Sequence, residues 1–344
     1  MELRELGNTG LKVSIVGFGG IPIQRVSNDE GVALLEEAKK LGINFIDTAR
    51  GYTTSEAKIG NYLSEDRESW IVATKSMARD AKTFSEDIQI SLKNLKVDYI
   101  DLYQFHNIST NEDYDHIFSE NGAYQAALDA QEKGLINHIG ITTHKSFIAE
   151  RAVESGKFAS IQVPFNAVED QFLPAIKKAS EKNIGVIVMK PLAGGALNNA
   201  TSALKYILEH SVTVVIPGMQ KSEEVRENAM LGHNFIGLAD VEREELERVA
   251  KELGNRFCRR CEYCLPCPQG IKIPTNFIFN GYLTRYNLKE WAIGRYFAQE
   301  VNASACVECG LCESRCPYDL PIIEMLKEVE NNFNAEKDSE VKNE

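Results

Sequence analysis

Short apolar runs alternate with segments of helical periodicity through the first two thirds of the chain, and this alternation constrains the fold more than any other feature. The runs are near-continuously apolar, as in residues 212–217 (VTVVIP), which is typical of strands buried on both faces. The runs that meet this description are residues 13–19, 44–49, 70–75, 99–106, 138–143, 160–165, 185–190 and 212–217. We therefore expect eight parallel strands, each followed by a helix.

The segments between the runs carry apolar residues every three or four positions, which predicts helices with one buried face. Capping-box signatures indicate where two of these helices begin, at Ser27 with Glu30 and at Thr83 with Glu86. Eight strand–helix units could form an open doubly wound sheet or a closed barrel. Residues 17–20 (GFGG) do not fit the G-x-G-x-x-G fingerprint expected after the first strand of an open dinucleotide-binding sheet. The sequence therefore predicts a (β/α)8 TIM barrel.

Further segments flank the predicted barrel. Residues 2–9 are expected to form a hairpin that turns at Gly7-Asn8 and plugs the bottom of the barrel, and residues 240–253 are expected to form a helix. All eight cysteines lie beyond residue 257, which indicates a domain boundary. We expect a barrel at 1–254, a small ferredoxin-like domain at 255–328 and a charged, disordered tail at 329–344.

Charge and hydropathy exclude several classes of partner. The net charge of −12 disfavours nucleic acid and anionic lipid. No run of eighteen apolar residues is present to span a membrane, and the N-terminus lacks the basic-then-apolar pattern of a signal peptide. We therefore expect a cytoplasmic protein without nucleic-acid or membrane partners. In a reducing compartment, clustered thiols are normally metal ligands and not disulfides.

Four polar residues lie at or just beyond the ends of the second, third and fourth predicted strands, where barrel enzymes place their chemistry. They are Asp47, Tyr52, Lys75 and His106. A tyrosine hydroxyl, with a pKa of about 10, is a weak acid, but a buried ammonium beside it lowers that pKa. Asp47 would keep the ammonium of Lys75 charged, and His106 would hydrogen-bond a substrate oxygen. The pattern predicts proton donation to a carbonyl oxygen during hydride transfer.

Three of these segments resemble the signature segments of aldo-keto reductases. They are residues 44–52 (NFIDTARGY), 72–75 (VATK) and 98–106 (DYIDLYQFH), and the resemblance extends over residues 1 to about 254. It implies a (β/α)8 fold that binds NAD(P)H across the barrel mouth and reduces a small aldehyde or ketone. It also implies that Asp47, Tyr52, Lys75 and His106 form the catalytic tetrad, with Tyr52 as the general acid.

The same resemblance implies cofactor-binding positions. Thr142 and Gln162 fall where the family holds the nicotinamide carboxamide. The positions that match the pyrophosphate loop and the adenosine segment are Lys190, Leu192, Gly194, Gly218, Lys221, Glu227 and Asn228. Met189 departs from the aromatic residue that stacks on the nicotinamide in many relatives. Glu224 stands where many relatives have arginine or glutamine near the 2′-phosphate. Because a carboxylate there would repel a phosphate, the choice between NADH and NADPH stays open.

The cysteines form two runs of four, each ending in Cys-Pro. The first run is C-x2-C-x2-C-x2-C, and the second, C-x2-C-x2-C-x3-C, has the bacterial ferredoxin spacing. The runs contain Cys258, Cys261, Cys264, Cys267, Cys306, Cys309, Cys312 and Cys316. Paired CxxC units also bind zinc, but zinc ribbons do not use two such runs. The pattern resembles a two-cluster ferredoxin module, which implies two [4Fe–4S] clusters whose fourth ligands, Cys267 and Cys316, are exchanged between the runs.

The role of the clusters is left open by the sequence. Nicotinamide transfers electrons in pairs as hydride, whereas each cluster transfers one at a time. The clusters could be structural, could exchange electrons with an external ferredoxin, or could dock a partner. The alternative to a reductase is an electron-transfer or redox-sensing protein that binds a nicotinamide cofactor with little carbonyl turnover. The complete tetrad argues against this alternative.

Overall fold

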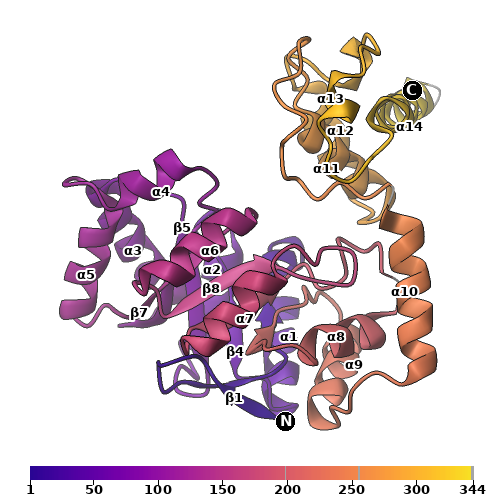
Figure 1. Cartoon of the computed structure of the whole chain (residues 1–344). Helices are drawn as coiled ribbons and strands as arrows, with labels where there is room; N and C mark the ends of the chain where they lie inside the picture. The colour runs from indigo at the N-terminus through magenta and orange to yellow at the C-terminus, as the bar shows by residue number, and fades with distance from the viewer. Residues whose placement is uncertain (198, 255, 342–344) are drawn as a thin grey trace. The chain divides into compact units, whose positions relative to one another are not determined.

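The computed structural model describes residues 1–197, 199–254 and 256–341, which fall into two compact units (Figure 1). The first unit contains Met1–Leu192 and Asn199–Arg243. The second contains Ala193–Asn198 and the chain from Glu244 onward. None of the helices in the described ranges is long and apolar enough to cross a membrane.

The first unit is built on an eight-stranded parallel sheet in which every strand pairs with its neighbour in sequence. Its strands are β3 (Phe18–Gly19), β4 (Phe45–Asp47), β5 (Ile71–Ser76), β6 (Ile100–Phe105), β7 (Ile136–Thr142), β8 (Ser160–Pro164), β9 (Gly185–Met189) and β10 (Val214–Val215). Gly17 N donates to the Val215 carbonyl at 2.9 Å, and Gly19 N donates to the Pro217 carbonyl at 3.0 Å. These bonds close the first strand onto the last. The predicted barrel is therefore confirmed.

Helices follow the strands and cover the outside of the sheet (Figure 1). They are η1 (Ile21–Arg25), α1 (Asn28–Lys40), α2 (Ser55–Leu63), α3 (Ala81–Leu95), α4 (Asn111–Ile117), α5 (Ala123–Glu132), α6 (Ser146–Ser155), α7 (Leu173–Glu181), α8 (Ala200–Leu208) and α9 (Ser222–His233). The next helix along the chain is α10 (Asp240–Gly254), whose residues from Glu244 onward belong to the second unit. The capping box of Ser27 and Glu30 is confirmed at the start of α1. The box predicted at Thr83 is wrong, because α3 begins earlier and Asp80 accepts the bond from Thr83 N at 2.9 Å.

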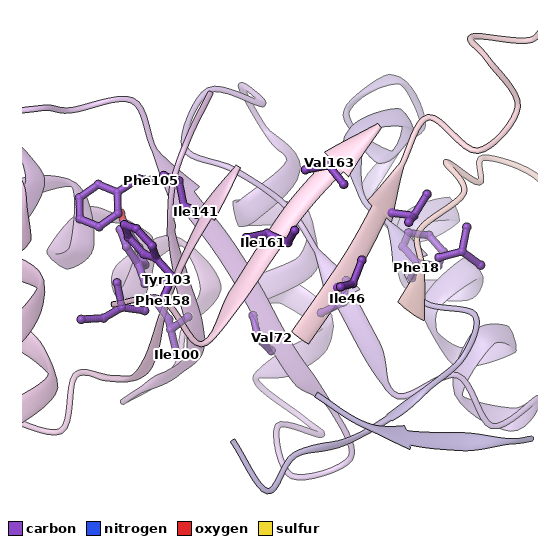
Figure 2. Close-up of a cluster of buried hydrophobic side chains, with 14 of the residues drawn as sticks. Phe18, Ile46, Val72, Ile100, Tyr103, Phe105, Ile141, Phe158, Ile161 and Val163 are labelled. Carbon is purple, nitrogen blue, oxygen red and sulfur yellow. The ribbon is translucent and has the colours of Figure 1, made fainter. Parts of the chain in front are cut away.

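The hydrophobic core of the barrel lies on both sides of the strands. Because successive side chains of a strand face opposite sides, Ile46, Val72 and Val163 point outward, toward the helices (Figure 2). Residues one position away face inward, and a separate buried cluster fills the interior. That cluster consists of Leu6, Val13, Phe45, Ala73, Leu102, Ile187, Val214 and Ile216.

The N-terminal hairpin differs from its prediction. Its strands are β1 (Leu3–Glu5) and β2 (Lys12–Ser14), paired antiparallel, so the apolar run at 13–19 is split between the hairpin and the short barrel strand β3. Leu6 packs in the interior cluster of the barrel, as expected of a plug. Gly185 makes room for it, because a Cβ there would lie 2.5 Å from Cδ1 of Leu6.

The second unit is a small helical assembly. Its elements are α11 (Ile273–Thr284), α12 (Lys289–Phe297), η2 (Ala303–Ala305), α13 (Leu311–Ser314) and α14 (Ile322–Val341). The disordered tail predicted for 329–344 is wrong as far as residue 341, because α14 extends through it. Val329 and Phe333 lie four residues apart on α14 and are fully buried, and Phe333 stacks on Tyr296 with ring centroids 3.9 Å apart. These two apolar residues at helical spacing anchor a segment that is otherwise polar, together with the ion pair between Glu336 and Lys289.

Candidate active site and cysteine cavities

Polar side chains form a layer in the barrel interior, directly above the apolar cluster. The strand register places Lys75 of β5 beside Gln104 of β6, and Thr142 of β7 beside Gln162 of β8. Asp47, the last residue of β4, faces the same interior. All five side chains are buried. Since the ends of parallel strands meet at one mouth of a barrel, residues distant in sequence form one site.

Lys75 and Asp47 form an ion pair at the centre of this layer. The ammonium Nζ lies 2.6 Å from Oδ1 and 2.7 Å from Oδ2 of Asp47, and it donates to the Thr48 carbonyl at 2.6 Å. Three acceptors match the three hydrogens of an ammonium group, which favours the charged lysine. Burial lowers the pKa of Lys75 and the negative charge of Asp47 opposes this shift. Removing either partner would leave an unpaired buried charge.

Tyr52 and His106 lie next to the ion pair. Tyr52 is in the loop between β4 and α2, and Lys75 Nζ lies 5.3 Å from the centroid of its ring. His106 follows β6, and its ring meets that of Tyr52 edge-on with centroids 5.8 Å apart. Burial and the positive charges of Lys75 and Arg79 lower the pKa of His106 to about 3. The imidazole is therefore neutral at physiological pH. The structure thus brings all four predicted tetrad residues together.

The sequence interpretation missed Gln104. Its Nε2 donates to Oδ2 of Asp47 at 3.3 Å, and Gln162 Nε2 lies 3.4 Å from Oδ1 of the same carboxylate. The available signal was the position of Gln104 two residues before His106, which puts both side chains on the same face of an extended strand. Among the described residues, the Oε1 atoms of Gln104 and Gln162 are buried without a hydrogen-bond partner. Orphaned acceptors fit a ligand that brings N–H donors, such as a carboxamide. Thr142 Oγ1 instead accepts from Asn107 N at 2.8 Å.

The predicted pyrophosphate loop follows β9 and adopts unusual backbone angles. Lys190 has a φ of +55°, and its carbonyl accepts from Asn166 Nδ2 at 3.1 Å. Leu192 is half-buried and, like Lys190, belongs to the first unit. Gly194 belongs to the second unit, where its φ is +67° and its carbonyl accepts from Arg285 Nε at 3.3 Å.

The predicted adenosine segment lies at the start of α9. Gly218 precedes this helix, Lys221 is its N-cap, and Glu227 and Asn228 lie on its second turn. Asn228 is buried and Glu227 is exposed. The carboxylate of Glu224 accepts from the backbone N–H groups of Gln220 at 2.8 Å and Lys221 at 3.2 Å. It therefore already occupies the helix N-terminus, where a phosphate would otherwise be favoured.

The eight cysteines, which form no disulfides, line two neighbouring cavities in the second unit. One cavity is lined by Cys258, Cys261, Cys264 and Cys316. The other is lined by Cys267, Cys306, Cys309 and Cys312, with Cys264 in the wall that the two cavities share. Apart from Cys264 in that shared wall, three cysteines of the second cavity come from the second run and one from the first, and the first cavity has the reverse arrangement. Four thiols around a cavity fit the donor set of an iron–sulfur cube.

Burial changes the chemistry of the thiols. It raises the pKa of Cys258 to about 11 and that of Cys264 to about 12. These thiols are neutral in the absence of a cation, so metal binding must displace their protons. In the described part of the chain, no three Cys, His, Asp or Glu side chains are grouped closely enough to hold a single metal ion.

Comparison with known proteins identifies both parts of the chain. Residues 15–202 match the model of the aldo/keto reductase family, and residues 257–321 match that of the 4Fe-4S dicluster domain. The first match covers more than half of the chain. The chain belongs to the aldo/keto reductase family. It is an oxidoreductase of this family that carries a C-terminal 4Fe-4S dicluster domain.

Several known proteins are moderately similar to this aldo/keto reductase. An uncharacterised oxidoreductase of Bacillus subtilis, YqkF, is 28% identical over 74% of this chain and 79% of its own. L-galactose dehydrogenase of Arabidopsis thaliana is 35% identical over 57% of this chain and 67% of its own. A structure described as an aldo-keto reductase of Pseudomonas aeruginosa superposes with a TM-score of 0.61 at 28% identity. It covers 67% of this chain and 95% of its own.

The lowered pKa of His106 gives a prediction for this reductase. We expect the imidazole nitrogen resonances of His106 to remain those of a neutral ring between pH 8 and pH 5, because the pKa is held near 3 by burial and by two cations. Nitrogen-15 NMR of the labelled histidines measures this, with His106→Gln to assign the signal. A titration of that signal with a midpoint near the ordinary value of about 6.5 would show that the ring is solvated.

Proposed function

We propose that the barrel reduces an aldehyde or ketone with NAD(P)H, and that Tyr52 is the general acid. The observation that carries this proposal is the buried ion pair of Lys75 and Asp47 beside the Tyr52 ring, with the neutral His106 on the ring edge. The bound nicotinamide would supply a hydride to the carbonyl carbon. The carbonyl oxygen then needs one proton, and the product is an alcohol.

Each tetrad residue has a separate part in this proton transfer. The hydroxyl of Tyr52 gives its proton to the carbonyl oxygen and becomes a phenolate. The Lys75 ammonium stabilises that phenolate by its positive charge, which makes the tyrosine a stronger acid. Asp47 keeps the ammonium oriented and charged. His106, being neutral, donates a hydrogen bond to the substrate oxygen without competing as an acid.

The side chains of the polar layer fit the nicotinamide end of the cofactor. Gln162 and Gln104 each offer a buried Oε1 acceptor, and a carboxamide NH2 group has two donors. We propose that Gln162 and Thr142 hold this group. Lys190 and Leu192 would hold the pyrophosphate, and the segment around α9 would hold the adenosine through Gly218, Lys221, Glu227 and Asn228.

The reverse reaction is a second candidate, because one similar protein is named L-galactose dehydrogenase. In that direction the phenolate of Tyr52 would accept the proton of a substrate hydroxyl, and the same Lys75 ammonium would favour the phenolate. The tetrad chemistry is unchanged. The equilibrium between alcohol and carbonyl then depends on the cofactor ratio and the substrate.

Replacing Tyr52 by phenylalanine tests the proposed acid. We expect kcat for reduction of an aldehyde panel to fall roughly 10²-fold or more, the scale of general-acid catalysis, with the Kd for NADPH and NADH nearly unchanged. Tyr62→Phe is the control, because Tyr62 contacts Asp66 outside the polar layer. Equal kcat values for Tyr52→Phe and the wild type would reject the assignment. Inactivity of the wild type toward every carbonyl would favour the redox-sensing alternative.

The position of Glu224 supports a second proposal, that the enzyme has little preference for NADPH over NADH. Its carboxylate occupies the N-terminus of α9 and would repel a 2′-phosphate. Fluorescence titration with both cofactors measures this preference, and Glu224→Gln should shift it toward NADPH. Glu223→Gln removes the same charge from the same helical turn and should change it less. A wild-type preference above about 100-fold, roughly 2.7 kcal/mol, would contradict this placement of Glu224.

We also propose that the second unit binds two [4Fe–4S] clusters with exchanged fourth ligands. The support is that Cys316 lines the cavity of the first run and Cys267 that of the second. The cluster domain proposed at 255–328 lies inside the second unit, whose main segment begins at Glu244 and whose core extends to Phe333 of α14. Thiolate-bound clusters suit a reducing cytoplasm. If the clusters carry electrons, an external one-electron carrier such as a ferredoxin would be the partner.

Iron analysis tests the exchange. Protein purified without oxygen should contain about eight iron and eight sulfide per chain, the content of two cubes. Cys316→Ala should damage the cluster held by Cys258, Cys261 and Cys264, whereas Cys309→Ala should damage the other one. Mössbauer or EPR spectra of the two variants should therefore differ. Zinc in place of iron, or about four iron per wild-type chain, would refute the two-cluster proposal.

A further inference from the structure

A second buried carboxylate, Glu56, lies on the outer side of the strand that carries Lys75. It is in the first turn of α2 and is 1% exposed. Four donors contact it: Thr74 Oγ1 at 2.8 Å, Ser91 Oγ at 2.7 Å, Asn94 Nδ2 at 3.1 Å and Arg50 Nη1 at 3.3 Å. These donors come from β5, from α3 and from the loop that follows β4. These hydrogen bonds hold the carboxylate in place, and they also hold the side chains that donate to it.

The hydrogen bonds of this network hold β5 on both sides of Lys75. Thr74 and Ser76 flank Lys75 and point away from the barrel interior, because successive strand residues face opposite sides. Thr74 donates to Glu56, and the hydroxyl of Ser76 donates to Asp87 on α3. The position of Lys75 along the strand is therefore fixed from outside the barrel.

Arg50 joins the two carboxylates of the network. Its Nη1 lies 3.3 Å from Glu56, and its Nε lies 3.3 Å from Asp87. The backbone N–H of Arg50 donates to the carbonyl of Lys75 at 3.0 Å. The loop that carries Tyr52 is thereby tied to the strand that carries Lys75.

Lys75 thus has a carboxylate on each side of its strand. Burial lowers the pKa of Lys75, and the charges of Asp47 and Glu56 both act to raise it. The other titratable groups facing Lys75 are Tyr52 and His106. On the outer side, Glu56 faces Arg50 and the phenol of Tyr103, and Asp87 faces Arg50. Asp87 is not among the charges that act on Lys75.

We propose that Glu56 is a positioning residue for the proton transfer, acting through Lys75 from the outer face of β5. It touches neither the reacting atoms nor Tyr52. Through Thr74 and Arg50 it fixes the strand, and through its charge it helps the ammonium of Lys75 to remain protonated beside Tyr52. This inference rests on the carbonyl reduction proposed above.

The test is the pH profile of kcat for carbonyl reduction by the full-length chain. Glu56→Gln keeps the shape of the side chain and removes its negative charge. Loss of that charge favours the deprotonated forms of both Lys75 and Tyr52, so the alkaline limb should move to lower pH by roughly half a unit or more. The Kd for NADPH and NADH should remain unchanged. Glu56→Asp, which keeps the charge, should keep the limb near its wild-type position.

Two variants separate this role from a merely structural one. Asp87→Asn removes a carboxylate from the same network and should leave the limb in place. Thr74→Val removes the hydrogen bond between Glu56 and β5 and keeps the charge of Glu56. It should lower kcat with the Kd for NADPH and NADH unchanged, so it decides the matter if Glu56→Gln does not fold. An unmoved limb in Glu56→Gln, or an unchanged kcat in Thr74→Val where that variant is needed, overturns the proposal. If instead the wild type lacks Tyr52-dependent turnover, the proposed function itself has failed.

Discussion

The buried ion pair between Lys75 and Asp47 is the interaction on which the chemistry proposed for the barrel depends. Closing eight strands into a barrel leaves an interior that side chains must fill, and most of that interior is apolar. An unpaired charge there would be prohibitively costly. The pair is tolerated because both carboxylate oxygens and the Thr48 carbonyl accept from one ammonium. The same burial that makes the pair costly strengthens its influence on Tyr52, since a low dielectric magnifies the effect of a nearby charge.

The alternating faces of the strands determine which residues share this environment. Inward positions of β5 and β6 carry Lys75 and Gln104, whereas outward positions carry Thr74, Ser76 and Tyr103. The inward side is a polar layer over an apolar plug. The outward side meets the helices, where the ring of Phe84 packs against both Tyr103 and Phe105. Tyr103 and Phe105 lie together on this side in Figure 2. A one-residue shift in the register of β5 would turn Lys75 outward and bring one of its neighbours into the interior. The hydrogen bonds that hold β5 from its outer face therefore help to keep Lys75 in the site.

The predictable parts of the structure were those governed by periodicity or by strand ends. Apolar runs located the eight strands, and the position of Tyr52, Lys75 and His106 at or beyond the ends of three of them was enough to predict convergence. Gln104 was missed because it lies inside its strand, whereas the prediction rested on polar residues at or beyond the strand ends. The hairpin strand Lys12–Ser14 was merged into the barrel because its apolar residues continue into the next run. The helix through residues 329–341 was missed because the anchoring contact, Phe333 on Tyr296, joins segments far apart in sequence.

The two units of the chain differ in what stabilises them, and this bears on the part that the cysteines play. The barrel has a large apolar core of its own, and all four residues of the proposed tetrad belong to the barrel unit. The second unit has a small core in which Cys264 is itself a member and several other cysteines pack against it. If the cysteine side chains of such a unit move out of their cavities, the unit loses part of its core. Cluster binding and folding are therefore coupled. Nothing in the proton transfer proposed at Tyr52 requires an electron from the clusters. Loss of the clusters should therefore unfold the second unit before it alters the tetrad.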